Sequence, residues 1–228
     1  MTDPRPHPTE KTGKTERTAM TASDQGRTGP VPAPPVPERI LAAAKAAPGQ
    51  WIGLVDPYWR GEGEPPDWAV IGRWRAGEDG SVEEFAENGE YRPSPLAREW
   101  PAPTDPVDAA VQLAATGYGP AEDVYRALAA ARFAVLLDGS GGVGGFGLPD
   151  GAPAVVVYSA RSWLEAAGNP DHAVIGPGTL LERLPPGLGI VVNPGAPAAM
   201  RLDPGALWSA LDARDRAGEP AHPPRPFD

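Results

Sequence analysis

Residues 139–144 read GSGGVG and match the G-x-G-x-x-G spacing of dinucleotide-binding loops. That spacing serves a dinucleotide only where a helix starts at the loop, because the helix N-terminal amides then hold the pyrophosphate. Here the chain continues GFGLPDGAPAV, which is typical of a turn followed by a strand, and no P-loop lysine follows. We therefore predict a flexible hairpin loop at this position.

Acidic and histidine side chains offer the other possible chemistry. Asp56 and Asp67 would suit acid and base catalysis if their carboxyl groups lay close together. Each adjoins a proline, however, a pattern typical of turns and caps. His7, His172 and His222 have no partner at a metal-binding spacing, His172 is expected in an exposed loop, and no G-x-S-x-G elbow occurs. We expect no catalysis, no cofactor and no metal.

Composition narrows the classes of partner. The formal net charge is −10, distributed as +1 over residues 1–36, −6 over 37–105 and −5 over 106–228. Nucleic acids and anionic membranes attract basic surfaces, so we expect neither as a partner. No apolar run is long enough to cross a membrane. The chain has no cysteine, which suits a reducing cytoplasm.

Residue usage divides the 228 residues into four segments. Residues 1–36 are rich in Thr, Pro and charge and have no aromatic side chain, so we predict a disordered tail. Within it, residues 30–37 (PVPAPPVP) suit a polyproline spacer, with an SH3-type ligand as the alternative. Residues 37–105 are a Trp-rich module that ends in a Pro-rich linker. Residues 106–214 alternate helices with strands, and residues 215–228 are a second tail.

The Trp-rich module is predicted to be a short helix followed by an antiparallel β-meander. PERILAAAKAAPG (37–49) has a helical apolar pattern that ends at Pro-Gly. WIGLV (51–55), WAVIGRW (68–74) and the more polar VEEF (82–85) have the composition of strands. A turn-rich loop joins the first two strands, and AGEDGS joins the second to the third.

Four of the chain's seven tryptophans lie in residues 51–75. A module of this size needs large aromatic side chains in its core, so we predict Trp51, Trp68 and Trp74 there. Tyr58 and Trp59 lie instead among the prolines and glycines of the loop. Aromatic side chains on such loops are typical binding anchors, so we predict that these two, together with Asp67, contact a partner.

The larger domain carries clear helix and strand signals. In residues 104–117 a Thr or Asp cap precedes a proline and an apolar stripe, and a glycine stops the helix. Near-continuous apolar strands such as AVVVY and GIVV indicate a sheet covered by helices on at least one face. The fold class that follows is α/β (α+β): an N-terminal helix and antiparallel meander, then a mixed sheet flanked by helices.

Residues 180–195, LLERLPPGLGIVVNPG, resemble the N-terminal domain of the enhanced serine sensitivity (SseB) family. The family pattern is L-L-x-x-L-P-x-G-x-G, two hydrophobic residues and N-P-G. The matching positions are Leu181, Leu184, Pro185, Gly187, Gly189, Asn193, Pro194 and Gly195. The strand before this segment departs from the family, because it ends Tyr158-Ser159-Ala160 rather than in a Phe-Thr-Ser-like sequence. The resemblance covers about residues 120–212.

The ordered chain also resembles actinobacterial proteins called type VII secretion system-associated proteins. Residues 51–75 fit their pattern W-x-G-x-V-D-P-x-W-x-G-E-G-x-P-P-D-W-A-V-x-G-x-W-R. YRPSP (91–95) and DPVDAAVQLAATGYG (105–119) fit as well. This resemblance covers roughly residues 36–212 and implies association with a secretion apparatus, without assigned catalytic residues.

These observations favour a non-catalytic, cytoplasmic adaptor that binds protein partners, with secretion-system components as the expected class. The alternative is a small-molecule-binding or metabolic regulatory protein of the serine-sensitivity type. Its ligand would then lie beside GLGIVVNPG and contact Asn193. The same motif also suits a tight turn at a strand end. A hydrolase that uses Asp56 and Asp67 is the third interpretation.

Overall fold

The structure is a computed structural model that describes residues 34–148 and 151–218. The chain divides into two units, Met1–Pro35 and Val36–Asp228, and every element below belongs to the second unit. Most of the tail expected at residues 1–36 therefore lies outside the described residues, as do residues 219–228.

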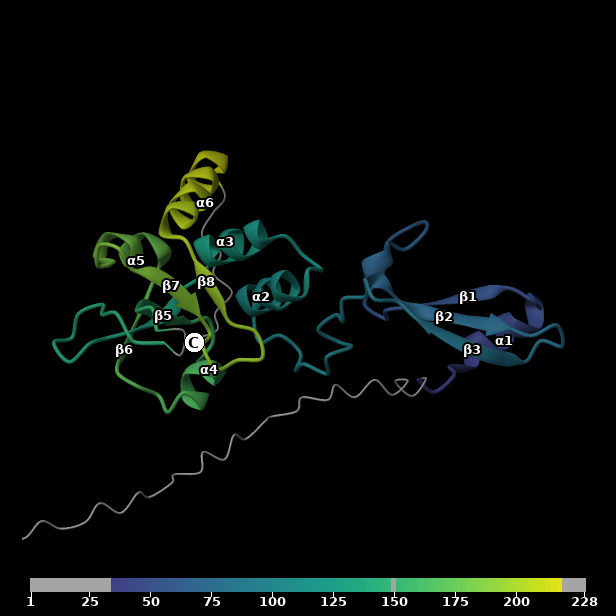
Figure 1. Ribbon diagram of the computed structural model, residues 1–228. Coiled ribbons are helices and arrows are strands. Elements are labelled where there is room, and N and C mark those ends of the chain that lie inside the picture. Colours follow the sequence, from purple (N-terminus) through teal and green to yellow (C-terminus); the bar gives the residue numbers. More distant parts are fainter. Residues whose placement is uncertain (1–33, 149–150, 219–228) are drawn as a thin grey trace, which may run out of the picture. The chain divides into compact units, whose positions relative to one another are not determined.

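A helix and a small sheet come first in this unit. The elements are α1 (Glu38–Ala46), β1 (Trp51–Val55), the short 3₁₀ helix η1 (Asp67–Ala69), β2 (Val70–Ala76) and β3 (Val82–Glu87). The strands pair antiparallel in the order β1-β2-β3, and α1 packs on β1 and β2 (Figure 1). The predicted helix and meander are confirmed.

The core of this sheet forms around Trp74. Alternate side chains of β2, including Val70 and Trp74, are buried. Trp74 packs with Ile40 of α1 and Leu54 of β1, and its ring centroid lies 4.8 Å from that of Phe85 on β3. β2 therefore presents one face to the core, as alternating side chains of a strand do.

Two of the three tryptophans predicted in this core lie elsewhere. Trp51 pairs with Arg75 on β2, and paired residues project from the same face of a sheet. Arg75 is solvent-exposed, so Trp51 lies on the outer face and is 47% exposed. Trp68 belongs to η1, before β2 begins, so the strand alternation does not direct it inward.

β3 forms one edge of this sheet and carries a row of acidic side chains. Glu83, Glu84 and Glu87 are all exposed. Arg75 on the neighbouring strand forms ion pairs with Glu83, at 2.8 Å, and with Glu84, at 3.5 Å.

A mixed sheet with flanking helices makes up the rest of the unit. Its elements are α2 (Pro106–Thr116), α3 (Ala121–Ala130), β4 (Phe133–Leu136), β5 (Ala154–Tyr158), α4 (Arg161–Ala166), β6 (His172–Ile175), α5 (Pro177–Arg183), β7 (Gly189–Val192), β8 (Met200–Leu202) and α6 (Pro204–Ala217). The strand order is β6-β4-β5-β7-β8, in which β5 and β7 are parallel and the other pairs antiparallel. This arrangement confirms the α/β (α+β) class.

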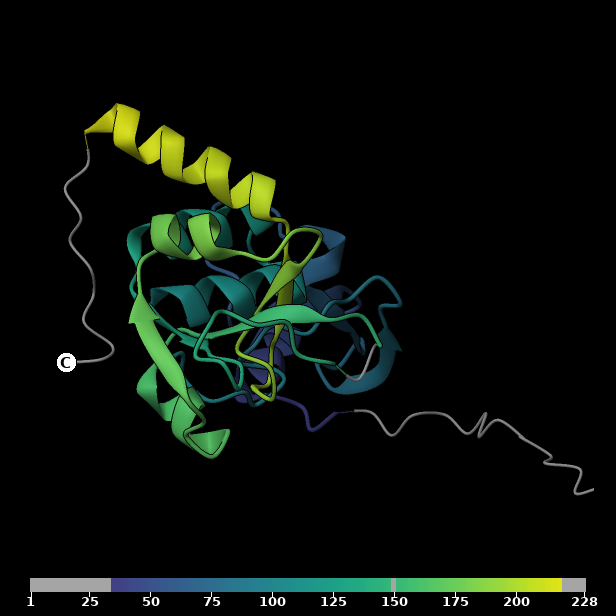
Figure 2. The ribbon, with the colours of Figure 1, turned by 90° about the vertical axis from the view of Figure 1, so that its left-hand side faces the viewer.

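The central strands bury side chains on both faces. Phe133 and Val135 of β4 belong to the large core, which α2, α3, α5 and α6 cover. Ala134 and Leu136 belong to a smaller cluster with Leu164 of α4. Figures 1 and 2 show α4 on the opposite side of the sheet from the other four helices, with α6 lying across α3 and α5.

Three segments test finer expectations. The GSGGVG loop is a turn, as predicted: Asp138 Oδ1 accepts hydrogen bonds from the amides of Ser140 (2.8 Å) and Gly142 (3.1 Å), and a strand follows. His172, expected in an exposed loop, instead begins the half-buried strand β6 and pairs with Leu136. α6 continues to Ala217, so the tail expected from residue 215 starts inside a helix.

Candidate functional site

The structure brings Tyr58 and Trp59 together with side chains from distant parts of the chain. Tyr58 is 39% exposed, Trp59 is half-buried, and both lie in the loop between β1 and η1. Asp67 is exposed at the start of η1. Asn193 lies apart from these residues and is fully buried after β7.

Asp56 fixes the loop that carries the two aromatic residues. Its side chain is 1% exposed. One carboxylate oxygen accepts from the amide of Tyr58 (2.8 Å), and the other accepts from the hydroxyl of Tyr91 (2.7 Å) and the amide of Ser94 (3.2 Å). The Asp56 carbonyl accepts from the amide of Trp59 (3.0 Å). This residue therefore ties the loop to the linker that follows the meander.

The same contacts set the protonation of Asp56. Burial alone disfavours the charged carboxylate, but the hydrogen bonds from Tyr91, Tyr58 and Ser94 outweigh it and lower the pKa of Asp56. A lowered pKa and occupied oxygens suit a structural anion. The side chain of Asp67 shares none of these hydrogen bonds, and the hydrolase that would use both carboxylates stays a prediction.

Four aromatic rings form a continuous edge-to-face series. Trp59 lies 5.6 Å from Trp68, Trp68 lies 4.9 Å from Tyr118, and Tyr118 lies 5.6 Å from Tyr58, measured between ring centroids. Edge-to-face pairs of this kind are favourable, so each ring fixes the orientation of the next. The series joins the loop and η1 to the segment after α2.

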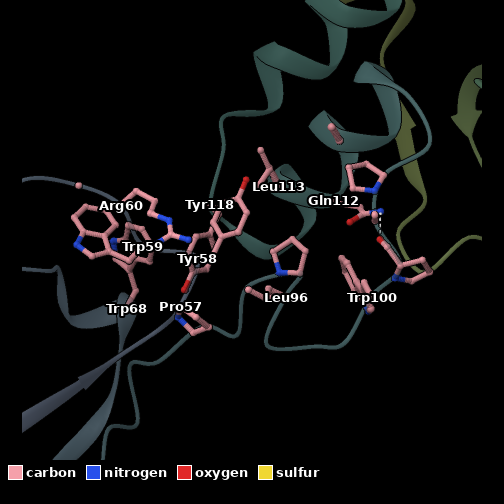
Figure 3. A pocket seen from close by; sticks show the side chains of 16 residues that line it. Pro57, Tyr58, Trp59, Arg60, Trp68, Leu96, Trp100, Gln112, Leu113 and Tyr118 are labelled. Carbon is pink, nitrogen blue, oxygen red and sulfur yellow. Dashed lines mark hydrogen bonds between the residues drawn. The ribbon is translucent and has the colours of Figure 1, made fainter. Parts of the chain in front are cut away.

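Gly61 allows Trp59 to lie flat against the loop. A Cβ atom at Gly61 would overlap the Trp59 indole. The indole is thus held between the Gly61 backbone on one side and Trp68 on the other. In Figure 3, Trp59 and Trp68 lie side by side, with the Arg60 side chain beside them.

These rings form one end of a groove of about 810 Å³. The linker supplies the other end, where Leu96 and Trp100 lie (Figure 3). Arg98 lies with its guanidinium carbon 5.5 Å from the Trp100 ring centroid, and Gln112 of α2 donates to the carbonyl of Pro101 (3.3 Å). Four prolines also contribute to the walls: Pro57, Pro95, Pro101 and Pro103.

Tyr118 is a groove residue that sequence reasoning missed. Its hydroxyl is buried and has no hydrogen-bond partner among the described residues. Burial, reinforced by the negative charge of Asp56, raises the pKa of Tyr118, so the phenol is neutral at physiological pH. The one available signal was its position directly after Gly117, the left-handed residue (φ 77°) that ends α2.

Asn193 belongs to a separate, buried polar network at the ends of the parallel strands. Its Oδ1 accepts from the amide of Ser159 (2.9 Å), and its Nδ2 donates to the Ser159 hydroxyl (2.8 Å). That hydroxyl donates to Asp105 (2.7 Å), whose other oxygen caps α2 through the amide of Val107 (2.7 Å). With φ at 49° and no exposed surface, Asn193 forms a strand-end turn, and its contact with a partner stays a prediction.

Within residues 34–148 and 151–218, no cluster of three or more His, Asp or Glu side chains is arranged to hold a metal ion. None of the helices in the described ranges combines the length and apolar character that a membrane crossing requires.

No curated protein and no solved structure is significantly similar to the chain. Residues 107–209 match the family model of the SseB protein N-terminal domain. The match begins in α2 and ends in α6, so it spans the mixed sheet and leaves the Trp-rich module outside. The mixed sheet and its helices are therefore similar to an SseB N-terminal domain, as the LLERLPPGLGIVVNPG segment predicted.

Proposed function

We propose that this protein is a non-catalytic adaptor that binds a protein partner in the aromatic groove. The observation that carries this proposal is the edge-to-face series of Tyr58, Trp59, Trp68 and Tyr118 at a groove of about 810 Å³. Aromatic side chains that are rigid before binding lose little conformational entropy on association, which is why they dominate binding hot spots.

The loop contacts support the same proposal. Asp56 and Gly61 hold Tyr58 and Trp59 in place without any ligand. Burying an anion is costly, and the hydrogen bonds that offset this cost at Asp56 also fix the backbone of the loop in one geometry. The loop therefore presents Tyr58 and Trp59 in a fixed position, as a recognition surface requires.

The cellular setting of the proposal rests on sequence resemblance. The pattern in residues 51–75 resembles that of type VII secretion system-associated proteins, and this pattern includes most of the groove loop. On the strength of this resemblance we propose that the protein acts in the cytoplasm, beside such a secretion machinery. The SseB-like sheet would serve as the scaffold or as a second binding surface.

An affinity experiment tests the adaptor proposal. Tagged full-length protein is used to capture partners from cytosol of the organism that encodes it, and the captured proteins are identified by mass spectrometry. The double variant Tyr58→Ala/Trp59→Ala is compared with Trp51→Ala, which removes an exposed tryptophan outside the groove.

We expect secretion-system components to be captured by the wild type and by Trp51→Ala and to be lost from the double variant. Circular dichroism and thermal unfolding check that both variants fold. Equal capture by all three proteins would show that the groove is not the binding surface.

A second candidate function is small-molecule binding by the SseB-like domain. A cavity of about 780 Å³ lies beside residues 184–189, which overlap the start of the GLGIVVNPG segment where the alternative interpretation expected a ligand, and Asn193 does not line it. Tyr125 and the partly exposed Trp208 also line it. Native mass spectrometry of the full-length protein purified from its own cytosol would detect such a ligand, and the mass shift should disappear in Trp208→Ala. A wild-type protein of unshifted mass would dismiss this candidate.

A further inference from the structure

The groove has walls that suit proline rings. Its aromatic members include Trp59, Trp68 and Trp100, and Arg60 is the one charged side chain among the lining residues that the structure describes. A surface of this composition offers flat, apolar faces on which pyrrolidine rings stack.

Three tryptophans that line the groove make no indole hydrogen bond within the described residues of the protein. The indole N–H groups of Trp59, Trp68 and Trp100 donate to no acceptor in the described part of the chain. By contrast, Trp163 outside the groove donates to Asp108 (3.3 Å). Because these tryptophans are half-buried, water can satisfy their N–H groups in the free protein, and a ligand that displaces this water must supply acceptors in its place.

Backbone geometry distinguishes the kinds of peptide that meet this requirement. A helix uses its carbonyl groups internally, so it has none for the indoles. A β-strand would need a free sheet edge, and the groove walls consist of loop and helix side chains. A polyproline II segment has no internal hydrogen bonds, and its prolines have no N–H to satisfy, so its carbonyls are free to accept.

The charged side chains near the groove further restrict the kind of peptide that would bind there. Arg60 forms no ion pair within the described residues, and Arg98 lies over Trp100 at the other end of the groove. Two positive charges beside an otherwise neutral groove stand out in a chain of net charge −10. They complement an acidic side chain on the ligand.

We propose that the groove binds a proline-rich polyproline II segment of a partner protein that carries an acidic residue opposite Arg60. This proposal rests on the adaptor function and specifies the chemistry of its partner. The indoles of Trp59, Trp68 and Trp100 donate to the segment's carbonyls, and its proline rings stack on the aromatic faces.

Fluorescence polarisation with the full-length protein tests this assignment. The probes are fluorescein-labelled nine-residue peptides: Pro₄-Glu-Pro₄, its counterpart with lysine in place of glutamate, and a Gly/Ser peptide with the same central glutamate. The protein variants are Arg60→Glu, Trp59→Phe and Trp59→Ala, with Trp51→Ala as the matched control outside the groove.

We expect the glutamate peptide to bind about two- to fivefold more tightly than the lysine peptide, as for a partly exposed ion pair. Arg60→Glu should reverse that order. Trp59→Ala should weaken binding at least about tenfold, and Trp51→Ala should leave it unchanged. Trp59→Phe retains a ring but no N–H donor, so an intermediate loss is expected even if Trp59→Ala fails to fold.

Three results would overturn the proposal. The first is binding of the Gly/Ser peptide as tightly as the proline peptide, and the second is no proline-peptide binding up to about 1 mM. The third is self-association, measured by analytical ultracentrifugation and abolished by Trp59→Ala, which would make a second copy the occupant. The adaptor function is tested separately by the capture experiment. That experiment can still show that the groove variant loses a natural partner when the proline peptides do not bind.

Discussion

Replacing Asp56 with asparagine tests whether this carboxylate is an anchor. Asparagine has nearly the same shape and keeps one oxygen, which can still accept from the amide of Tyr58. The new amide group then faces the two donors that the second oxygen served, the Tyr91 hydroxyl (2.7 Å) and the Ser94 amide (3.2 Å). The hydroxyl can rotate and accept instead, whereas the Ser94 amide cannot.

The expected cost follows from these contacts. A hydrogen bond to a charged group contributes about 1.5–3 kcal/mol, and a buried donor without an acceptor costs about 1–3 kcal/mol. Since Asp56 is 1% exposed, water does not compensate. We expect Asp56→Asn to lower the free energy of unfolding by about 2–4 kcal/mol at pH 7, or the melting temperature by about 4–16 °C.

The pH dependence of this loss has a definite sign. The folded-state pKa of Asp56 is below its ordinary value of 3.8, so the carboxylate stabilises the fold above that value. The stabilisation disappears as pH falls through the lower, folded-state pKa. The difference between wild type and variant should therefore be constant from about pH 7 to pH 5 and shrink below about pH 4.

Urea unfolding followed by tryptophan fluorescence at several pH values measures both effects. Asp67→Asn is the matched control, because Asp67 is exposed and its side chain makes no hydrogen bond within the described residues, so a change below about 0.5 kcal/mol is expected. Equal stability of wild type and Asp56→Asn at pH 7, or a loss that persists undiminished at pH 3, would refute the anchoring role.

Three further predictions follow from burial and hydrogen bonding. Trp74→Ala should lower the free energy of unfolding by about 3–5 kcal/mol, because the Trp74 side chain is only 5% exposed. Trp51→Ala should lower it by less than about 1 kcal/mol, because Trp51 is 47% exposed. Comparable losses for the two variants in urea unfolding would contradict the assigned faces. Asp105→Ala should cost about 2–4 kcal/mol, since it removes a helix cap and leaves the Ser159 hydroxyl without its acceptor; unchanged thermal unfolding would count against that network. Asn193→Ala should lower the free energy of unfolding by about 2–4 kcal/mol, because alanine tolerates the left-handed backbone poorly and makes neither hydrogen bond to Ser159. Lost ligand binding at unchanged stability would instead favour a binding role for Asn193.

Local signals made the helices predictable. α2 has its cap at Asp105 and its stop at Gly117, both within the segment itself. The strands of the mixed sheet were equally clear, because both faces are buried and the apolar runs are continuous. β6 was missed because its residues are only half-buried and its polar first residue, His172, resembles a loop.

Non-local pairing explains the errors in the Trp-rich module. A strand pattern gives two faces, but which face is inward depends on the partner strand and on α1. Trp51 faces outward because it pairs opposite Arg75, and Trp68 lies in a turn that forms against Tyr118. The loop aromatics, Tyr58 and Trp59, were recognised because proline and glycine mark the loop directly in the sequence.

The acidic side chains along β3 affect whether the small sheet can pair with a strand of another molecule. β3 is an outer strand, and unpaired outer strands invite edge-to-edge growth, the first step of fibril formation. A second copy that approached along β3 would bring Glu83, Glu84 and Glu87 against the same carboxylates. Repulsion between like charges disfavours this pairing, although Arg75 on the neighbouring strand offsets part of the charge at Glu83 and Glu84. Because salt screens such repulsion, edge-to-edge pairing along β3 is expected to become easier as ionic strength rises.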